Sequence, residues 1–308
     1  MAYLYLLMGP DEELGLARVE LVALAGCLAR DRVAIGPAGV DVTRAAYTRL
    51  CSEQLAAGTN WSELHQAIAQ LELHCDAFRI EVFRPAPKVP VSSSELQRSI
   101  ADLISGGPDL DHPQTRFAVV ITHNGWYFGP IISRSAQRWR YHADRPYNYS
   151  QGLAPQMARA LVNLVAAPGD VLLDPCCGSG TVVAEALADG IHAWGIEINV
   201  ALAQQAAANI RALRLPANIC VGDARNLSGD FDAAVVDFPY GHSTPVASRL
   251  YTDILHNLRS QVSRMALVFG HDAHRLLARL GLRTIQTAAV AKGRFRRHIY
   301  VVAGEKGQ

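Results

Sequence analysis

One stretch of the chain, residues 171–181, constrains the fold more than any other. Three aliphatic residues lead into Asp174, and small residues with two glycines, Gly178 and Gly180, lead on into the apolar run 182–187. This order predicts a buried parallel strand, a tight turn and the N-terminus of a helix. Glycines in such a turn let a ligand approach backbone N–H groups without a side chain in the way.

The second half of the chain continues in the same manner. From residue 153 onward, apolar strand-like segments alternate with helical ones, which predicts a mostly parallel, doubly wound α/β sheet. Ligands of such sheets bind beyond the carboxyl ends of the strands, near the point where the strand order reverses. The expected strands are 171–174, 192–196, 218–222, 232–236, 264–269, 283–289 and 296–302.

Each of the first four of these strands ends in an acidic residue: Asp174, Glu197, Asp223 and Asp237. Carboxylates gathered at one sheet edge repel one another unless a ligand or solvent separates them. A nucleoside cofactor fits this pattern, with Glu197 placed to bind a ribose diol and Asp223 to accept from an adenine amino group. The alternative is a set of solvated strand-end acids in an ordinary α/β domain.

The glycine pattern by itself does not identify the ligand. A dinucleotide site prefers a third glycine three residues after the second, and Val183 stands at that position. The pattern therefore argues against a dinucleotide, while an ordinary turn stays open as an interpretation.

The first half of the chain reads as a small α+β region. We expect a strand at 3–8, an amphipathic helix at 12–29 and a second helix at 61–73. A strand at 78–84 precedes a helix that starts at Ser92, which has Glu95 at capping-box spacing. A further strand at 117–122 runs into an Asn-Gly hairpin at 123–129.

Three places carry residues suited to contacting a nucleic acid. Basic and aromatic side chains alternate over 134–149, which suits phosphate contact and base stacking, although a solvated linker fits equally. The basic tip at 293–298, with Arg294 and Arg296, suits RNA contact or the protection of an edge strand. His242 fits a substrate pocket or a plain loop.

Charge and cysteine usage narrow the classes of function. The net charge of +1 produces no field that would attract a polyanion to the whole protein, so a nucleic-acid site must be a local patch. The six cysteines form no CxxC pair, so we expect reduced thiols and no metal site. The N-terminus lacks a basic leader pattern and no apolar run reaches membrane-spanning length. We therefore expect a cytoplasmic protein without a membrane partner.

The last of the strand-end acids begins a recognisable motif. Asp237-Phe238-Pro239-Tyr240 resembles the [Asp/Asn]-Pro-Pro-Tyr motif of class I S-adenosylmethionine (SAM)-dependent enzymes that methylate exocyclic amino groups. The resemblance implies that the Asp237 carboxylate and a backbone carbonyl near Pro239 hold the amine in line with the donor methyl. Tyr240 would stack on a flipped-out base. Phe238 stands where proline is usual.

The likeness extends beyond this motif. Residues 145–241, and the loop from Asp174 to Thr181 above all, resemble the archaeal and eukaryotic tRNA guanosine N2-methyltransferases. The segment ending in Gly125-Trp126-Tyr127-Phe128-Gly129 is similar to their THUMP RNA-binding region. The resemblance implies that SAM is held by Asp174, Cys176, Gly178, Gly180, Thr181, Glu197, Asp223 and Ala224. It implies catalysis by Asp237, Pro239 and Tyr240, and substrate contacts from Arg145, Phe238, His242, Arg294 and Arg296.

These observations give a definite organisation. We expect a ferredoxin-like domain at 1–60, a THUMP-like RNA-binding domain at 61–133, a linker at 134–152 and a Rossmann-like SAM-dependent methyltransferase domain at 153–308. The expected reaction is methylation of an exocyclic amine in RNA, with N2 of a tRNA guanosine as the target. The alternatives are an amino methyltransferase of DNA adenine or cytosine, and an RNA-binding protein with a decayed active site.

Overall fold

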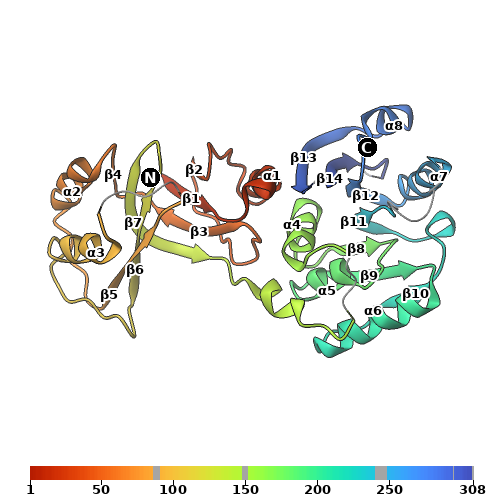
Figure 1. The fold of residues 1–308 in the computed structure, drawn as a ribbon, viewed down its shortest axis with the longest axis horizontal. Helices are drawn as coiled ribbons and strands as arrows, with labels where there is room; N and C mark the ends of the chain where they lie inside the picture. The colour runs from red at the N-terminus through yellow and green to blue at the C-terminus, as the bar shows by residue number, and fades with distance from the viewer. Residues whose placement is uncertain (86–90, 148–151, 240–247, 294, 307–308) are drawn as a thin grey trace. The chain divides into compact units, whose positions relative to one another are not determined.

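The structure is a computed structural model that describes residues 1–85, 91–147, 152–239, 248–293 and 295–306. The chain forms two compact units (Figure 1). The first unit consists of Met1–Gly9, Leu24–Thr43 and Tyr47–Ala136, and the second of Pro10–Ala23, Arg44–Ala46 and Gln137–Gln308.

The first unit is built on one mixed sheet. Its strand order is β2-β1-β3-β7-β6-β5. The short strand β4 also pairs with β7 and is not part of this order. The helices α2 (Trp61–Ala69) and α3 (Ser93–Ala101) bury Leu64 and Ile100 against Phe117 and Phe128 of the sheet. The strands are β1 (Tyr3–Leu7), β2 (Val33–Gly36), β3 (Thr48–Glu53), β4 (Ala56–Gly58), β5 (Phe78–Phe83), β6 (Thr115–Ile121) and β7 (Trp126–Arg134).

Local signals set the starts of both helices. The side chain of Asn60 accepts a hydrogen bond from the backbone N–H of Glu63 at the start of α2. The hydroxyl of Ser92 accepts from the N–H of Glu95 at 3.1 Å, as its capping spacing predicts. Each contact satisfies one of the backbone donors that a helix leaves free in its first turn.

The second unit contains the predicted doubly wound sheet. Its order is β10-β9-β8-β11-β12-β14-β13, and β14 runs antiparallel to both neighbours, while the other pairs are parallel. The strand order reverses between β8 and β11, which marks the switch point where ligands bind. The strands are β8 (Val171–Asp174), β9 (His192–Glu197), β10 (Ile219–Val221), β11 (Phe231–Asp237), β12 (Val262–Phe269), β13 (Thr284–Lys292) and β14 (Phe295–Ala303).

Helices cover both faces of this sheet (Figure 1). On one face α7 and α8 bury Leu255 and Leu277 against Val236 and Leu267 of the strands. On the other face α5 packs on β8 and β9, α6 on β9 and β10, and α4 on β11 and β12. The helices are α4 (Pro155–Val165), α5 (Thr181–Leu187), α6 (Val200–Ala212), α7 (Ser248–Leu258) and α8 (His274–Arg279).

The remaining helix, α1 (Leu14–Ala25), begins in the second unit and ends in the first. It is shorter than the expected span of 12–29 because a 3-10 turn at Asp11–Glu13 precedes it and Gly26 follows with a φ of +65°. Glycine in this left-handed conformation commonly ends a helix. No helix among the described residues is long and apolar enough to cross a membrane.

The two units differ from the expected domain boundaries. Residues 1–60 and 61–133 do not form separate sheets, because β3 pairs with β7 and so joins both segments. In addition, Pro10–Ala23 and Arg44–Ala46 belong to the second unit. There the buried carboxylate of Glu20 accepts from the N–H of Ala46 and from Asn163 Nδ2 of α4, both at 2.7 Å. These contacts join residues far apart in the sequence, which local patterns do not reveal.

Candidate active site

The loop after β8 turns sharply at its two glycines. Asp174, 3% exposed, ends the strand, and Gly178 and Gly180 then take φ values of +51° and +78°. Only glycine adopts such angles without strain. A Cβ at Gly180 would also lie 3.1 Å from the Cβ of Ala206 on α6. The glycines therefore let α5 start directly beneath the loop.

Glu197, at the end of β9, fixes the shape of this loop. One carboxylate oxygen accepts from the N–H of Gly178 at 2.9 Å, and the other accepts from the N–H of Asn199 at 2.9 Å. A carboxylate has about four acceptor positions, so each oxygen keeps capacity for a further donor. Glu197 thus holds the loop and can still bind a diol.

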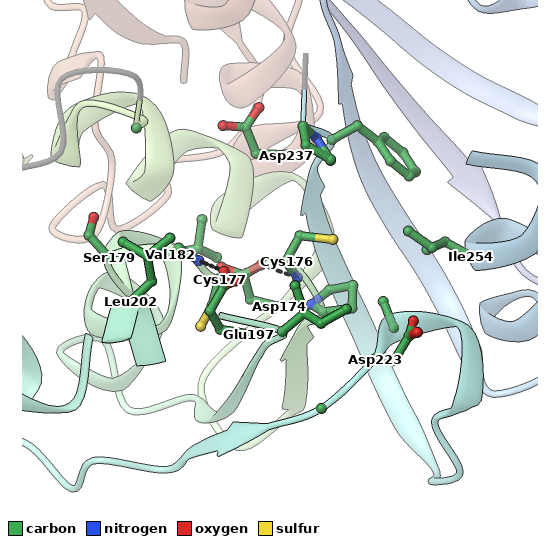
Figure 2. A pocket seen from close by; sticks show the side chains of 18 of the residues that line it. Asp174, Cys176, Cys177, Ser179, Val182, Glu197, Leu202, Asp223, Asp237 and Ile254 are labelled. Carbon is green, nitrogen blue, oxygen red and sulfur yellow. Dashed lines mark hydrogen bonds between the residues drawn. The ribbon is translucent and has the colours of Figure 1, made fainter. Parts of the chain in front are cut away.

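A cavity of about 410 Å³ opens at the switch point (Figure 2). Its volume falls in the range typical of small-molecule sites, about 300–1,000 Å³. All four strand-end acids line it: Asp174, Glu197, Asp223 and Asp237. The expected residues Cys176, Gly178, Thr181, Ala224, Phe238 and Pro239 also line it, whereas Gly180 does not.

The acids of the cavity differ in their electrostatic environment. Burial raises the pKa of Asp174 well above its usual value, and the nearby charges of Asp237 and Glu197 raise it further. Hydrogen bonds from Arg225 lower the pKa of Asp223, because the guanidinium Nε lies 3.0 Å from both carboxylate oxygens. The cavity thus combines a carboxyl that resists ionisation with one that is held ionised.

The two thiols of the loop stay protonated. Burial raises the pKa of both Cys176 and Cys177, and the nearby carboxylates of Asp174 and Glu197 add to the effect. A neutral thiol is a poor nucleophile and metal ligand. Cys176 and Cys177 are therefore apolar lining, and the described residues hold no cluster of three or more His, Cys, Asp or Glu arranged for a metal ion.

The motif at the end of β11 divides between cavity and core. Asp237 and Pro239 line the cavity. Phe238 is also among the lining residues, but its ring is 1% exposed and stacks on Phe269 at a centroid distance of 4.6 Å. The ring is thus committed to the core rather than presented to a substrate. Three expected site residues, Tyr240, His242 and Arg294, lie outside the described residues.

The other expected substrate contacts, Arg145 and Arg296, are not among the residues that line the cavity. The Arg145 guanidinium donates from Nη1 to the hydroxyl of Thr181 at 2.9 Å, so it faces the first turn of α5. Arg296 is exposed near the start of β14 and does not line the cavity. Arg145 therefore supports the loop from Asp174 to Thr181, called the cofactor loop below. Arg296 is separate from the cavity.

Sequence reasoning missed several lining residues. Ile198 follows the strand-end acid Glu197 and is 67% exposed, so it offers an apolar surface at the cavity rim. Its position directly after a strand-end acid is the signal that would have found it. Arg225 follows Asp223 by two residues and could have been found in the same way. The further missed residues are Gly152, Leu153, Pro175, Cys177, Ser179, Val182, Leu202, Gly222, Leu250 and Ile254.

Comparison with known proteins places this half of the chain in a family. Residues 142–300, more than half of the chain, match the family model described as RMKL-like, methyltransferase domain (UPF0020). The matched region contains the cofactor loop, all four strand-end acids and the described part of the motif at Asp237.

Two curated relatives come from archaea, and both are named tRNA (guanine(10)-N2)-dimethyltransferase. The protein of Methanothermobacter thermautotrophicus is 28% identical over 193 residues, which cover 58% of this chain and 57% of the relative. That of Pyrococcus abyssi is 32% identical over 138 residues, 42% of each chain. This chain thus spans about half the length of the curated relatives it matches.

Solved structures share the fold over the whole chain. The crystal structure of TrmN from Thermus thermophilus matches with a TM-score of 0.53 and 20% identity, covering 99% of this chain and 100% of that one. A possible methylase from Clostridium difficile 630 matches with a TM-score of 0.51 and 15% identity, covering 100% and 99%. At these identities the likeness concerns the fold.

Proposed function

The chain belongs to the RMKL-like methyltransferase family, and from that premise we propose that it methylates an exocyclic amino group of RNA with SAM. The proposed target is N2 of a guanosine in tRNA, because the curated relatives carry that activity in their names. The observation that supports amine chemistry most directly is the motif at the end of β11, where Asp237 and Pro239 line the cavity.

The residues of the cavity fit SAM. Glu197 keeps acceptor capacity for the ribose hydroxyls, and the exposed side chain of Ile198 offers an apolar face for the adenine. Asp223 is an acceptor for the adenine amino group, with its carboxylate oriented by Arg225. The loop from Asp174 to Gly178 would bind the methionine part of SAM. When bound, SAM would supply an electrophilic methyl group.

This chain's own residues would orient the amine and receive its proton. An aryl amine is a poor nucleophile because its lone pair is delocalised into the ring. Acceptors at its N–H groups would hold the nitrogen in line with the methyl, and the proposed acceptors are the Asp237 carboxylate and a backbone carbonyl near Pro239. The nitrogen gains a bond to carbon and must lose a proton, which Asp237 or water takes up.

The remaining parts of the proposal concern the first unit and the partner. We assign RNA binding to residues 61–133, on the basis of their resemblance to the THUMP region. tRNA as the partner rests on the names of the curated relatives. The cytoplasm as the place of action rests on the sequence alone. Arg294, Arg296, His242 and Tyr240 stay candidates for substrate contact.

The role of Asp237 is tested by the variant Asp237→Ala. Removing the acceptor should reduce methyl transfer to a tRNA transcript by at least about 100-fold, by analogy with the loss of one preorganised polar group in an active site. The dissociation constant for S-adenosylhomocysteine, measured by calorimetry, should change little because Glu197 and Asp223 carry that binding. Retained transfer by Asp237→Ala would remove the assignment.

The substrate is tested by nucleoside mass spectrometry on tRNA and duplex DNA incubated with the wild-type protein and SAM. We expect N2-methylguanosine in the tRNA and no new mark in the DNA. Methylated adenine or cytosine in the DNA would favour the DNA enzyme. Absence of transfer to both, together with tRNA binding, would favour an RNA-binding protein with a decayed site.

A further inference from the structure

A buried asparagine of α6 joins two separate segments of the second unit. Asn209 is 0% exposed, and its Oδ1 accepts from the backbone N–H of Tyr147 at 2.9 Å. Its Nδ2 donates to the carbonyl of Tyr147 at 2.9 Å and to that of Ser179 at 3.0 Å. A side-chain amide has two donor hydrogens, so Asn209 uses both of them on the backbone. It thus connects the expected linker, which contains Tyr147, to the cofactor loop, which contains Ser179.

The linker segment that Asn209 holds is also attached to α5. We call residues 142–147 the strap. The Nδ1 atom of His142 lies 2.6 Å from a carboxylate oxygen of Glu185, and Arg145 donates to the hydroxyl of Thr181 at 2.9 Å. The strap is therefore docked on the helices of the second unit and is not a solvated connection.

The bond to Ser179 fixes one peptide group in the turn of the cofactor loop. The peptide between Ser179 and Gly180 donates its N–H to the carbonyl of Cys177 at 2.8 Å, while its oxygen accepts from Asn209. Glycine takes positive and negative φ about equally easily, so a turn with two glycines has other backbone conformations available. Because this peptide is held at both ends, Gly180 is kept at its φ of +78°.

The face of α6 that carries Asn209 packs directly on this turn. A Cβ added at Gly180 would lie 3.1 Å from the Cβ of Ala206 and 3.3 Å from Cδ1 of Ile210. Ala206 and Ile210 are one helical turn apart and share this face with Asn209. Close packing therefore limits movement of the loop toward α6, and the bond from Asn209 limits movement away from it.

We propose that Asn209 is a positioning residue that couples the strap to the cofactor loop and keeps the loop in the conformation that binds SAM. The inference rests on the proposed function, since it needs this loop to hold the methionine part of SAM. Ser179 lines the cavity and Asn209 does not, so Asn209 acts through the loop. Holding a loop in its bound conformation strengthens binding, because the loop does not have to become ordered when the ligand arrives.

The variant Asn209→Ala tests this role. We expect the dissociation constant of S-adenosylhomocysteine, measured by calorimetry, to rise about tenfold, which corresponds to the loss of one buried hydrogen bond. KM for SAM should rise in parallel. The value of kcat for tRNA at saturating SAM should stay within about twofold, since the loop has the same conformation in both proteins once SAM is bound.

The matched control is Gln261→Ala. The side-chain amide of Gln261 also joins two segments, because its Nε2 donates to the carbonyls of Leu227 and Asn257, both at 2.9 Å. Gln261 directly precedes β12, so it lies at the opposite edge of the sheet from the cavity. Its loss should lower the melting temperature, while the dissociation constant of S-adenosylhomocysteine stays within about twofold of the wild-type value.

Hydrogen exchange in the wild-type protein tests the coupling without any substitution. The amide of Tyr147 donates to Asn209, and Tyr147 does not line the cavity. Adding S-adenosylhomocysteine should therefore slow exchange at Tyr147 together with exchange at Gly180 of the loop. Slower exchange at Gly180 with no change at Tyr147 would contradict the coupling, even if Asn209→Ala fails to fold.

The possible outcomes separate this inference from the proposed function. If the wild-type protein and Asn209→Ala bind S-adenosylhomocysteine equally well, the role of Asn209 is overturned and the function stands. Equal weakening in Asn209→Ala and Gln261→Ala would also overturn it, because the loss would then follow stability. If the wild-type protein does not bind S-adenosylhomocysteine, the proposed function and this inference are both overturned.

Discussion

At the scale of single residues, environment separates side chains that the sequence presents as equivalent. Asp174 and Asp223 both end a strand and both line the cavity. Asp174 is buried beside other acids, which raises its pKa, whereas the guanidinium of Arg225 lowers the pKa of Asp223. The first is therefore a source of pH-dependent stability.

The sign of that dependence follows from proton uptake. The folded-state pKa of Asp174 is raised above the unfolded value of about 3.9, so the native state holds its proton over a range in which the unfolded chain has lost it. The stability of the cofactor-free protein falls as pH rises from about 4 toward the raised pKa.

The variant Asp174→Asn has no carboxyl to titrate at this position and should therefore lose this dependence of stability on pH. We expect its melting temperature to exceed the wild-type value by several degrees at pH 8 and to approach it near pH 4, measured by calorimetry. A difference independent of pH would contradict this account.

At the scale of secondary-structure elements, a buried ionic network joins α4 to α5 and to Asp189, two residues beyond the end of α5. Arg159 of α4 is 2% exposed and contacts Glu185 at 3.0 Å and Asp189 at 2.6 Å. His142 reaches the other oxygen of Glu185 at 2.6 Å, and Arg44 contacts Asp189 at 2.7 Å. Each acid thus bridges two basic side chains, which fixes the orientation of the helices behind the cofactor loop.

Removing the central cation should be strongly destabilising. Arg159→Leu leaves the fully buried Glu185 without its guanidinium, and breaking a buried pair in this way costs about 3–5 kcal/mol. Urea denaturation of the cofactor-free protein should show that loss. The double variant Arg159→Leu with Glu185→Leu should recover much of it, because no buried charge is then stranded at Glu185. A single variant as stable as wild type would show that the network contributes little.

At the scale of the whole molecule, the second unit is assembled from three stretches of chain. The stretch Pro10–Ala23 contributes Glu20, which bonds Asn163 of α4, and Arg44–Ala46 contributes the Arg44 guanidinium, which also donates to the carbonyl of Ala166 at 2.8 Å. A catalytic unit cut at the linker would lose these partners and leave buried polar groups unsatisfied.

A fragment of residues 137–308 should therefore be less stable than the same region in the full chain. We expect its melting temperature to be lower by several degrees and its affinity for S-adenosylhomocysteine to fall, measured by thermal unfolding and calorimetry. Glu20→Ala in the full chain should reproduce part of the loss. Equal melting temperatures for the fragment and the full chain would show that the inserted stretches are dispensable.

The sequence by itself determined the fold of the second half of the protein. The alternation of apolar strands and helices predicted every strand of the second sheet, and the acids that end the first four strands were found around one cavity. These features are visible in sequence because strand periodicity and strand ends are local properties. The caps of α2 and α3 are also local, because each joins a side chain to a backbone N–H three residues later.

Only the tertiary structure decided how distant residues complete that half. The contacts of Glu20 with α4, of Arg145 with the cofactor loop and of Tyr251 with Pro239 join segments with no shared periodicity. The burial of Phe238 belongs to the same class, because a motif position that suggests substrate contact gives no sign of the aromatic residues packed behind it. Such contacts depend on how the chain packs in three dimensions, and that packing is what fixes the backbone at Pro239 and the first turn of α5.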